Sequence, residues 1–345
     1  MANKRPVLLV GSVAMNSTTE VFERVAGALG NSARRIPDGE TGVRRDWIGW
    51  QGAVFGKAAG LEVAGTRPVP GGEPFTIYRA KPGASTGDIK MGALGYAAVA
   101  EESYREFTRL RAAGKIPAGV RFEVCLPTPL APVAGFIDSG DVTRVWPAYE
   151  RHIIEETTGI CRAIPHRDLA IQWDIAVEMV ALEAAKAGVP GPFPAGVTIK
   201  EMADSIARVT NNVPADVEVG LHFCYGDRGH KHMIEPSDTS LMVELSNLCT
   251  AAITRPITWI HMPVPRDRDD DAYYAPLKNL KLNPGTEFYL GLVHRTGGIE
   301  GNRRRVAAAS KVVKDFGVAT ECGLARRPAD TMDDVLALHR TVAEL

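Results

Sequence analysis

Two short apolar runs, far apart in the chain, carry side chains that bind soft metal ions. His222 and Cys224 stand two residues apart in EVGLHFCYGD, and Cys322 lies in GVATECGL. Side chains two residues apart on a β-strand point to the same face, so His222 and Cys224 would project side by side. If both runs are parallel strands of one sheet, Cys322 reaches the same end of that sheet. The imidazole and the two thiolates could then be ligands of a tetrahedral zinc site, whereas the structural alternative is ordinary core packing.

The same segments resemble the metal-binding segments of a known enzyme superfamily. HFCYGD and ECGL are similar to those of cobalamin-independent methionine synthase and its relatives, which include epoxyalkane:coenzyme M transferase. Further similarities follow in family order, with VGS at 10–12, LPTPLAPV at 126–133 and IQWD at 171–174. In that superfamily a His-x-Cys and a later Cys-Gly-Leu bind a zinc ion that activates a thiol substrate. The resemblance therefore implies Zn²⁺ as the cofactor.

Three positions depart from the methionine synthase pattern. A Glu on the sixth strand completes the family's zinc site, and the nearest match here is His261. We expect His261 to be a metal ligand, since imidazole is an ordinary zinc ligand, with a catalytic base as the alternative. The family's Asp-Glu on the fourth strand appears as Asp174-Ile175, and the Asp before the last cysteine appears as Glu321. These positions hold the amino acid in methionine synthase, so homocysteine does not carry over as the substrate. We expect Asp174, His261 and Glu321 to be catalytic.

These residues need a scaffold that brings distant strand ends together. Apolar runs alternate with amphipathic helical patterns, which predicts an α/β fold and, with eight runs, a (β/α)8 TIM barrel. A doubly wound open sheet is the alternative, but no G-x-G-x-x-G follows the first run. The irregular stretch 43–95 has little apolar material, so we expect a substrate-covering insertion after the second strand of a single domain, 1–345. The predicted strands lie within 7–12, 33–42, 121–128, 169–174, 217–224, 257–264, 287–293 and 317–323. The predicted helices span 18–29, 97–113, 142–163, 198–210, 239–253, 302–316 and 332–342.

Polar side chains recur at the carboxyl ends of these predicted strands. In (β/α)8 barrels the catalytic groups lie at that end, and core packing does not explain such a series of ionisable residues. Besides the metal ligands and catalytic residues named above, we expect five residues from these ends to bind the substrate: Ser12, Asp38, Glu40, Thr128 and His294.

The segment DGETGVRRDWIGW has the composition of a substrate loop. Arg44 or Arg45 could hold a substrate carboxylate, and Trp47 or Trp50 could stack on a ring. The alternative is a rim loop whose tryptophans pack on the barrel.

The composition of the chain argues against some classes of binding partner. The 345 residues are 45% hydrophobic and 23% charged, which is ordinary for a soluble globular protein. Forty basic and 41 acidic residues argue against a nucleic-acid partner, and no apolar run is long enough to span a membrane. Five cysteines without short spacings do not make a disulfide framework, and no signal peptide is recognisable. We therefore expect a cytoplasmic protein with small-molecule partners, and leave a homodimer open.

The leading hypothesis is a zinc-dependent transferase that moves an alkyl group, with methyl preferred, between a small molecule and a thiol or similar nucleophile. The resemblance implies a thiol or a folate-type methyl carrier as the partner. The alternative is a barrel lyase or decarboxylase acting on a small carboxylated or aromatic compound, since related uroporphyrinogen decarboxylase-like barrels work without a metal. A third hypothesis is a non-catalytic protein that binds a metal or a thiol ligand.

Overall fold

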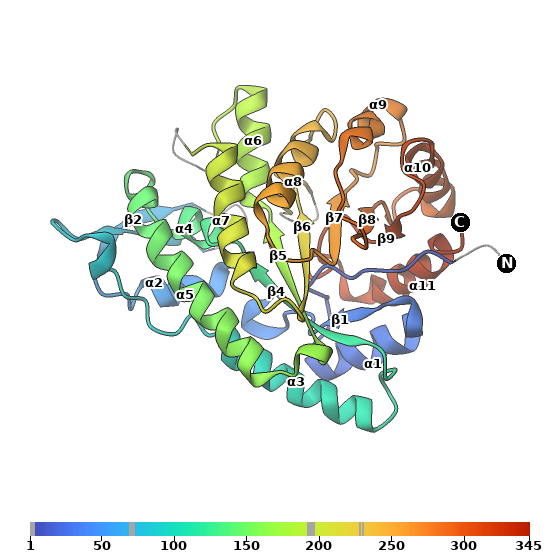
Figure 1. Cartoon of the computed structure of the whole chain (residues 1–345), viewed down its shortest axis with the longest axis horizontal. Helices are drawn as coiled ribbons and strands as arrows, with labels where there is room; N and C mark the ends of the chain where they lie inside the picture. The colour runs from blue at the N-terminus through green and yellow to red at the C-terminus, as the bar shows by residue number, and fades with distance from the viewer. Residues whose placement is uncertain (1–3, 69–72, 192–196, 228, 230) are drawn as a thin grey trace.

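The centre of the molecule is a curled sheet of seven parallel strands, in the order β1-β4-β5-β6-β7-β8-β9. Helices lie around the outside of this sheet (Figure 1). The computed structural model describes residues 4–68, 73–191, 197–227, 229 and 231–345. Two further strands, β2 and β3, form a separate antiparallel pair. The strands are β1 Arg35–Pro37, β2 Leu61–Arg67, β3 Phe75–Ala80, β4 Arg121–Pro127, β5 Leu169–Ile175, β6 Glu218–Phe223, β7 Trp259–Pro263, β8 Glu287–Gly291 and β9 Gly317–Val318.

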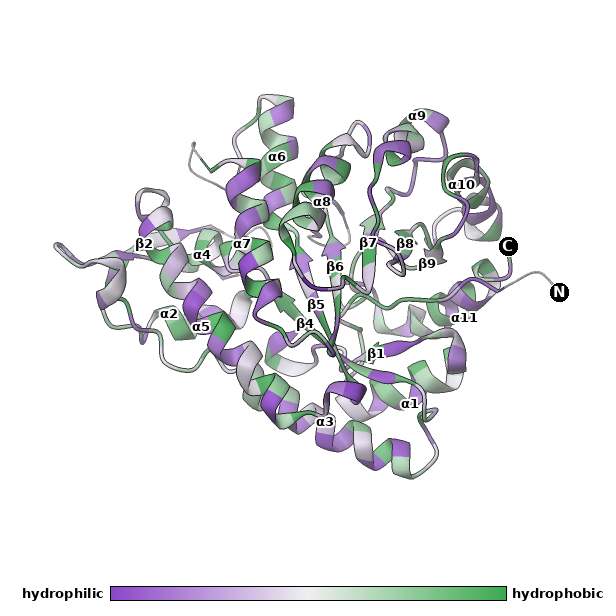
Figure 2. Ribbon diagram, in the orientation of Figure 1, coloured by the Kyte–Doolittle hydropathy of each residue, from purple (hydrophilic) through white to green (hydrophobic). Residues whose placement is uncertain are grey.

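Local sequence signals explain where several helices begin and end. The Ser17 side chain accepts the backbone N–H of Glu20 at the start of α1, and Thr198 begins α7 with a capping box. Gly188 ends α6 in the left-handed conformation that glycine adopts without strain. Apolar and polar residues are mixed along the helices, as expected of elements that cover a sheet (Figure 2). The helices are α1 Thr18–Leu29, α2 Gly52–Phe55, α3 Tyr96–Ala112, α4 Leu130–Phe136, α5 Val142–Ala163, α6 Val177–Ala187, α7 Ile199–Asn211, α8 Ser240–Ala252, α9 Asp271–Tyr274, α10 Gly298–Val312 and α11 Met332–Val342.

The segment around Val7 lies between the two edge strands of the sheet. Val7 makes isolated parallel bridges with Ala33, just before β1, and with Val318 in β9. The backbone N–H of Leu8 donates to the Val318 carbonyl at 3.0 Å, and that of Val318 donates to the Pro6 carbonyl at 2.9 Å. This segment was predicted to be the first strand, but its pairing is limited to single bridges and it is not a strand of the sheet.

The concave side of the sheet is filled by its own side chains. Trp259 is fully buried there, and a Cβ added to the neighbouring Gly220 would lie 1.8 Å from its ring. The guanidinium of Arg35 stacks on the same ring at 4.1 Å, where it is held by ion pairs of 3.1 Å with Glu218 and Glu287. The apolar residues packed together here come from β5, β7 and β8, from the segment around Val7 and from the residue after β9: Leu8, Val10, Ala170, Trp259, Tyr289 and Ala319.

The predicted elements agree well with the observed ones in the sheet. Six of the seven strands of the sheet fall within predicted strands, and β5 extends one residue beyond its prediction, to Ile175. Helices α1, α5 and α11 have the predicted bounds. Four of the described helices were not predicted: the short helices α2 and α9, α4 in the proline-rich stretch after β4, and α6 after β5. Within the insertion the β2–β3 ribbon projects away from the sheet at the left of Figure 1. No helix in the described part of the chain is long and apolar enough to cross a membrane.

Candidate metal centre and its surroundings

His222, Cys224 and Cys322 converge at the carboxyl end of the sheet. His222 is in β6, Cys224 follows the strand directly, and Cys322 follows β9. Their ligand atoms all lie within 4.8 Å of one another, and the two sulfur atoms are 3.4 Å apart. His222 and Cys224 are 3% and 2% exposed. Among the described residues, no other group of three or more His, Cys, Asp or Glu side chains could hold an ion.

His261 lies beside His222 but outside this group. The two histidines are direct partners in the register of β6 and β7, and their Nδ1 atoms are 2.7 Å apart. The Nε2 atom of His261 donates to the Thr320 carbonyl at 3.1 Å. Gly291 in β8 leaves room for this ring, since a Cβ there would lie 2.8 Å from His261 Nε2. Both ring nitrogens of His261 therefore have partners within the protein.

Burial decides the protonation of these groups. Burial, together with the neighbouring His261, holds the pKa of His222 well below its ordinary value, and burial lowers the pKa of His261 to about 3. The hydrogen bond between Cys322 and Cys224, together with burial, raises the pKa of Cys322 well above its ordinary value. A neutral imidazole is the form that binds a metal ion, whereas a thiol gives up its proton when the ion binds.

Asp174 is the next polar group around the rim of the sheet. It ends β5, where it pairs in register with His222. Its carboxylate accepts the indole N–H of Trp47 at 3.1 Å and the side-chain amide of Gln172 at 2.9 Å. Burial, and then the negative charge of Glu40, raise the pKa of Asp174 well above its ordinary value. Sequence reasoning missed Gln172, although its spacing from Asp174 in IQWD puts both on one face of the strand.

Glu40 and Trp47 hold unusual backbone conformations in the loop beside Asp174. Their φ angles are 48° and 51°, the left-handed region that large side chains rarely adopt. The Glu40 carboxyl carbon is 3.8 Å from the position of a Cβ on Gly11. Burial raises the pKa of Glu40 to about 7, opposed by the cation of Arg44. Strained residues of this kind cluster at functional sites, because only a well-packed surrounding maintains them.

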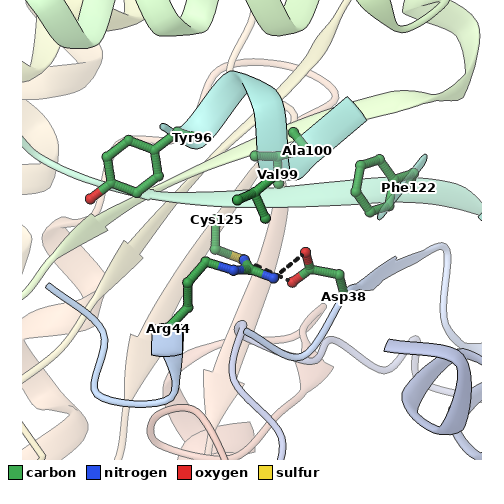
Figure 3. A pocket seen from close by; sticks show the side chains of 8 residues that line it. Asp38, Arg44, Tyr96, Val99, Ala100, Phe122 and Cys125 are labelled. Atoms are coloured by element: carbon green, nitrogen blue, oxygen red, sulfur yellow. Dashed lines mark hydrogen bonds and ion pairs between the residues drawn. The ribbon is translucent and has the colours of Figure 1, made fainter. Parts of the chain in front are cut away.

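Asp38 and Arg44 form a buried ion pair at the root of this loop. The guanidinium makes two bonds to the Asp38 carboxylate, at 2.7 and 3.2 Å, and the Ser103 hydroxyl adds a third at 2.7 Å. Figure 3 shows this pair beside a cavity of about 10 Å³, roughly the space of one water molecule. The cation of Arg44 is thus already neutralised inside the protein. Sequence reasoning missed Ser103, since nothing in α3 signals a contact with this loop.

His294 and Glu321 form a second buried pair. The Nε2–H of His294 donates to the Val264 carbonyl at 2.7 Å, and its Nδ1 lies 2.8 Å from the Glu321 carboxylate. Burial raises the pKa of Glu321 to about 7 and lowers that of His294 well below its ordinary value. Arg327 lies 3.5 Å from the same carboxylate. The geometry places a proton between His294 Nδ1 and Glu321, one residue before Cys322.

Ser12 and Thr128 complete the set of predicted substrate residues. The Ser12 hydroxyl lies 2.3 Å from the position of a Cβ on Gly323, so glycine is required there beside Cys322. The backbone N–H of Thr128 donates to the Asp174 carbonyl at 3.4 Å. Both residues therefore lie at the same end of the sheet as the candidate metal ligands.

Comparison with known proteins finds similarity in the fold. No protein-family model matches the chain, and no curated protein matches it. A structure from Listeria monocytogenes, provisionally described as a vitamin-B12 independent methionine synthase, matches with a TM-score of 0.60 and 14% identity, over 99% of this chain and 98% of that one. A B12-independent methionine synthase from Shewanella sp. W3-18-1, in complex with selenomethionine, matches with a TM-score of 0.61 and 13% identity, over 99% and 97%. At these identities the comparison shows a shared fold over nearly the whole chain.

Proposed function

We propose that this protein is a zinc-dependent transferase that moves an alkyl group, in particular methyl, between a small molecule and a thiol or similar nucleophile. The observation that carries the proposal is the convergence of His222, Cys224 and Cys322, whose ligand atoms lie within 4.8 Å of one another. The fold shared with two methionine synthase structures supports it.

The donor set fits zinc. Two thiols and an imidazole are soft ligands of the kind that zinc prefers. At Zn–S distances of 2.3 Å, sulfur atoms in a tetrahedral site are about 3.8 Å apart, and the observed separation of Cys224 and Cys322 is 3.4 Å. Only a small adjustment would admit the ion, and a fourth position would remain for a substrate atom. A zinc ion bound there would lower the pKa of a substrate thiol and so supply the nucleophile.

The surrounding side chains would bind and orient the substrate. Asp174 and Glu40 are carboxyl groups close enough for the charge on one to raise the pKa of the other. Such a pair binds a positively charged substrate group or holds a proton between its members. Trp47 fixes Asp174 through its indole N–H. On the other side of the metal ligands, Glu321 would hold a proton that it shares with His294.

We also propose that the curled sheet closes into a complete barrel. The bridges of Val7 to both edges of the sheet support closure into a complete (β/α)8 barrel, with the chain folded as one domain. Barrels of this kind carry their chemistry at the carboxyl ends of the strands, where these residues lie. The five cysteines are all unpaired, which suits a reducing, cytoplasmic setting.

The alternative of a metal-free lyase or decarboxylase has less support. A carboxylated substrate needs a cation at the site, and Arg44 was one of the two residues, with Arg45, expected to supply it. The Arg44 guanidinium is bound by Asp38 in a buried pair. We therefore do not propose this function as a second candidate.

The test is the metal content of cysteine variants. We expect wild-type protein to bind one zinc per chain, and Cys224→Ser to lose most of it while keeping its helix content, because the sheet core does not depend on the ligand. Cys249→Ser is the matched control, since that cysteine is buried in α8 outside the cluster and its loss should leave zinc in place. Thiol-dependent transfer by the wild-type enzyme then separates a transferase from a binding protein. Stoichiometric zinc in a Cys224, Cys322 double variant would reject the proposal.

A further inference from the structure

The hydrogen bonds of His261 form a chain that runs from a backbone carbonyl to His222. The Thr320 carbonyl can only accept, so the hydrogen at 3.1 Å belongs to Nε2 of His261. At 2.7 Å the two Nδ1 atoms are hydrogen-bonded, so one carries a hydrogen and the other a lone pair. With its hydrogen on Nε2, the neutral ring of His261 offers a lone pair at Nδ1. His222 then donates from its own Nδ1.

This arrangement decides which nitrogen of His222 is free. A neutral imidazole with a hydrogen on Nδ1 has its lone pair on Nε2. Within the described residues, Nε2 of His222 takes part in no hydrogen bond, and His222 shares the candidate metal group with Cys224 and Cys322. The opposite arrangement, with His261 donating from Nδ1, would make His261 a cation and put the hydrogen of neutral His222 on Nε2, and both would oppose binding of a metal cation.

We infer that His261 is a positioning residue that binds the Nδ1–H of His222, so that His222 Nε2 is held as a zinc ligand. The inference rests on the proposed function. Metal-bound histidines generally donate their other ring N–H to an acceptor that sets the tautomer and the ring orientation, and loss of that acceptor weakens metal binding by about 10- to 100-fold. Here the acceptor is a second imidazole, oriented in turn by the Thr320 carbonyl.

The geometry around His261 supports positioning over ligation. Neighbouring ligand atoms in a tetrahedral zinc site are about 3.5–3.8 Å apart. His261 lies outside the set whose ligand atoms fall within 4.8 Å of one another. The ring of His261 is also closely surrounded by backbone. A Cβ added to Gly291 would lie 2.8 Å from each of three atoms, His261 Nε2, the Thr320 carbonyl oxygen and Glu321 Cα, so these groups are packed tightly together.

Zinc-edge X-ray absorption and zinc affinity test the inference together. In the wild-type protein we expect two sulfur ligands and one imidazole. This ligand count is measured without any variant, so it remains informative even if a variant fails to fold. His261→Asn places an amide oxygen where Nδ1 stood and should keep both this count and the zinc affinity within a few-fold. His261→Leu removes the acceptor and should weaken zinc binding, measured against a chromophoric chelator, by about 10- to 100-fold. His339→Leu, which removes a buried imidazole from α11, is the control and should bind zinc like the wild type.

Two results would overturn the inference and leave the proposed function standing. One is a wild-type spectrum with two imidazoles that falls to one in His261→Asn, which would make His261 a ligand, as the sequence predicts. The other is an unchanged zinc affinity in a folded His261→Leu variant. A wild-type protein that binds no zinc would instead overturn the proposed function, and the inference with it.

Discussion

Glu123 is a buried acid whose replacement should change how stability depends on pH. It lies in β4, 1% exposed, and among the described residues neither of its carboxylate oxygens has a hydrogen-bond partner. Burial raises its pKa from 4.5 to about 8, although the cation of Arg35 opposes the shift. The folded protein therefore binds a proton at Glu123 that the unfolded chain has already released. Between pH 4.5 and about pH 8 the free energy of unfolding therefore falls as the pH rises.

The size of the effect follows from the two pKa values. One pH unit corresponds to about 1.36 kcal/mol, so the full interval costs about 5 kcal/mol in free energy of unfolding. Between pH 5.5 and 7.5 the expected loss is about 2 to 3 kcal/mol. Glu123→Gln has nearly the same shape and cannot ionise, so it removes this loss. The free-energy difference between variant and wild type should grow by about 2 to 3 kcal/mol over that range, in favour of the variant.

Equilibrium urea unfolding at the two pH values, followed by circular dichroism, measures this difference. Both proteins need the same metal content, so that metal binding cancels in the comparison. Glu101→Gln, on the exposed side of α3, controls for the loss of one negative charge. If the difference between Glu123→Gln and wild type is the same at pH 5.5 and 7.5, Glu123 does not hold a proton in the folded protein and the reasoning is wrong.

Two other substitutions separate positioning from substrate binding. Trp47→Phe removes the indole N–H that donates to Asp174. We expect kcat/KM for thiol-dependent transfer to fall about 10-fold with a melting temperature within a few degrees of wild type, since Asp174 loses a positioning bond and a typical hydrogen bond contributes about 1 kcal/mol. Unchanged kinetics would contradict this role. Arg44→Ala leaves the buried Asp38 carboxylate without its cation and should lower the free energy of unfolding by about 3 kcal/mol, measured by urea denaturation. Wild-type stability with only a raised KM would show instead that Arg44 binds the substrate.

Much of the scaffold could be predicted because the relevant signals are local. Helix α1 follows a serine cap, and α5 and α11 follow amphipathic patterns, so their bounds were predicted to the residue. Helix α6 was missed although its sequence, VEMVALEAAKA, consists largely of strong helix formers. The segment around Val7 was predicted as a full strand from its apolar residues. Its pairing depends on two edge strands that are remote in the sequence.

The candidate metal site was predictable to a similar extent. The period of a strand puts His222 and Cys224 on one face, and the common direction of parallel strands brings Cys322 to the same end. The first argument needs no tertiary structure, and the second needs only that both runs belong to one parallel sheet. The resemblance to methionine synthases suggested the same three residues, and their ligand atoms lie within 4.8 Å of one another.

The partners of the surrounding side chains were decided only by the tertiary structure. The sequence did not predict that Arg44 pairs with Asp38, or that His261 meets His222 through Nδ1 atoms 2.7 Å apart. The period of a strand or helix determines the face on which a side chain projects, because that depends only on local backbone geometry. What the side chain meets there depends on the curl of the sheet and on the space left by residues such as Gly291, which are set by packing between segments distant in the chain.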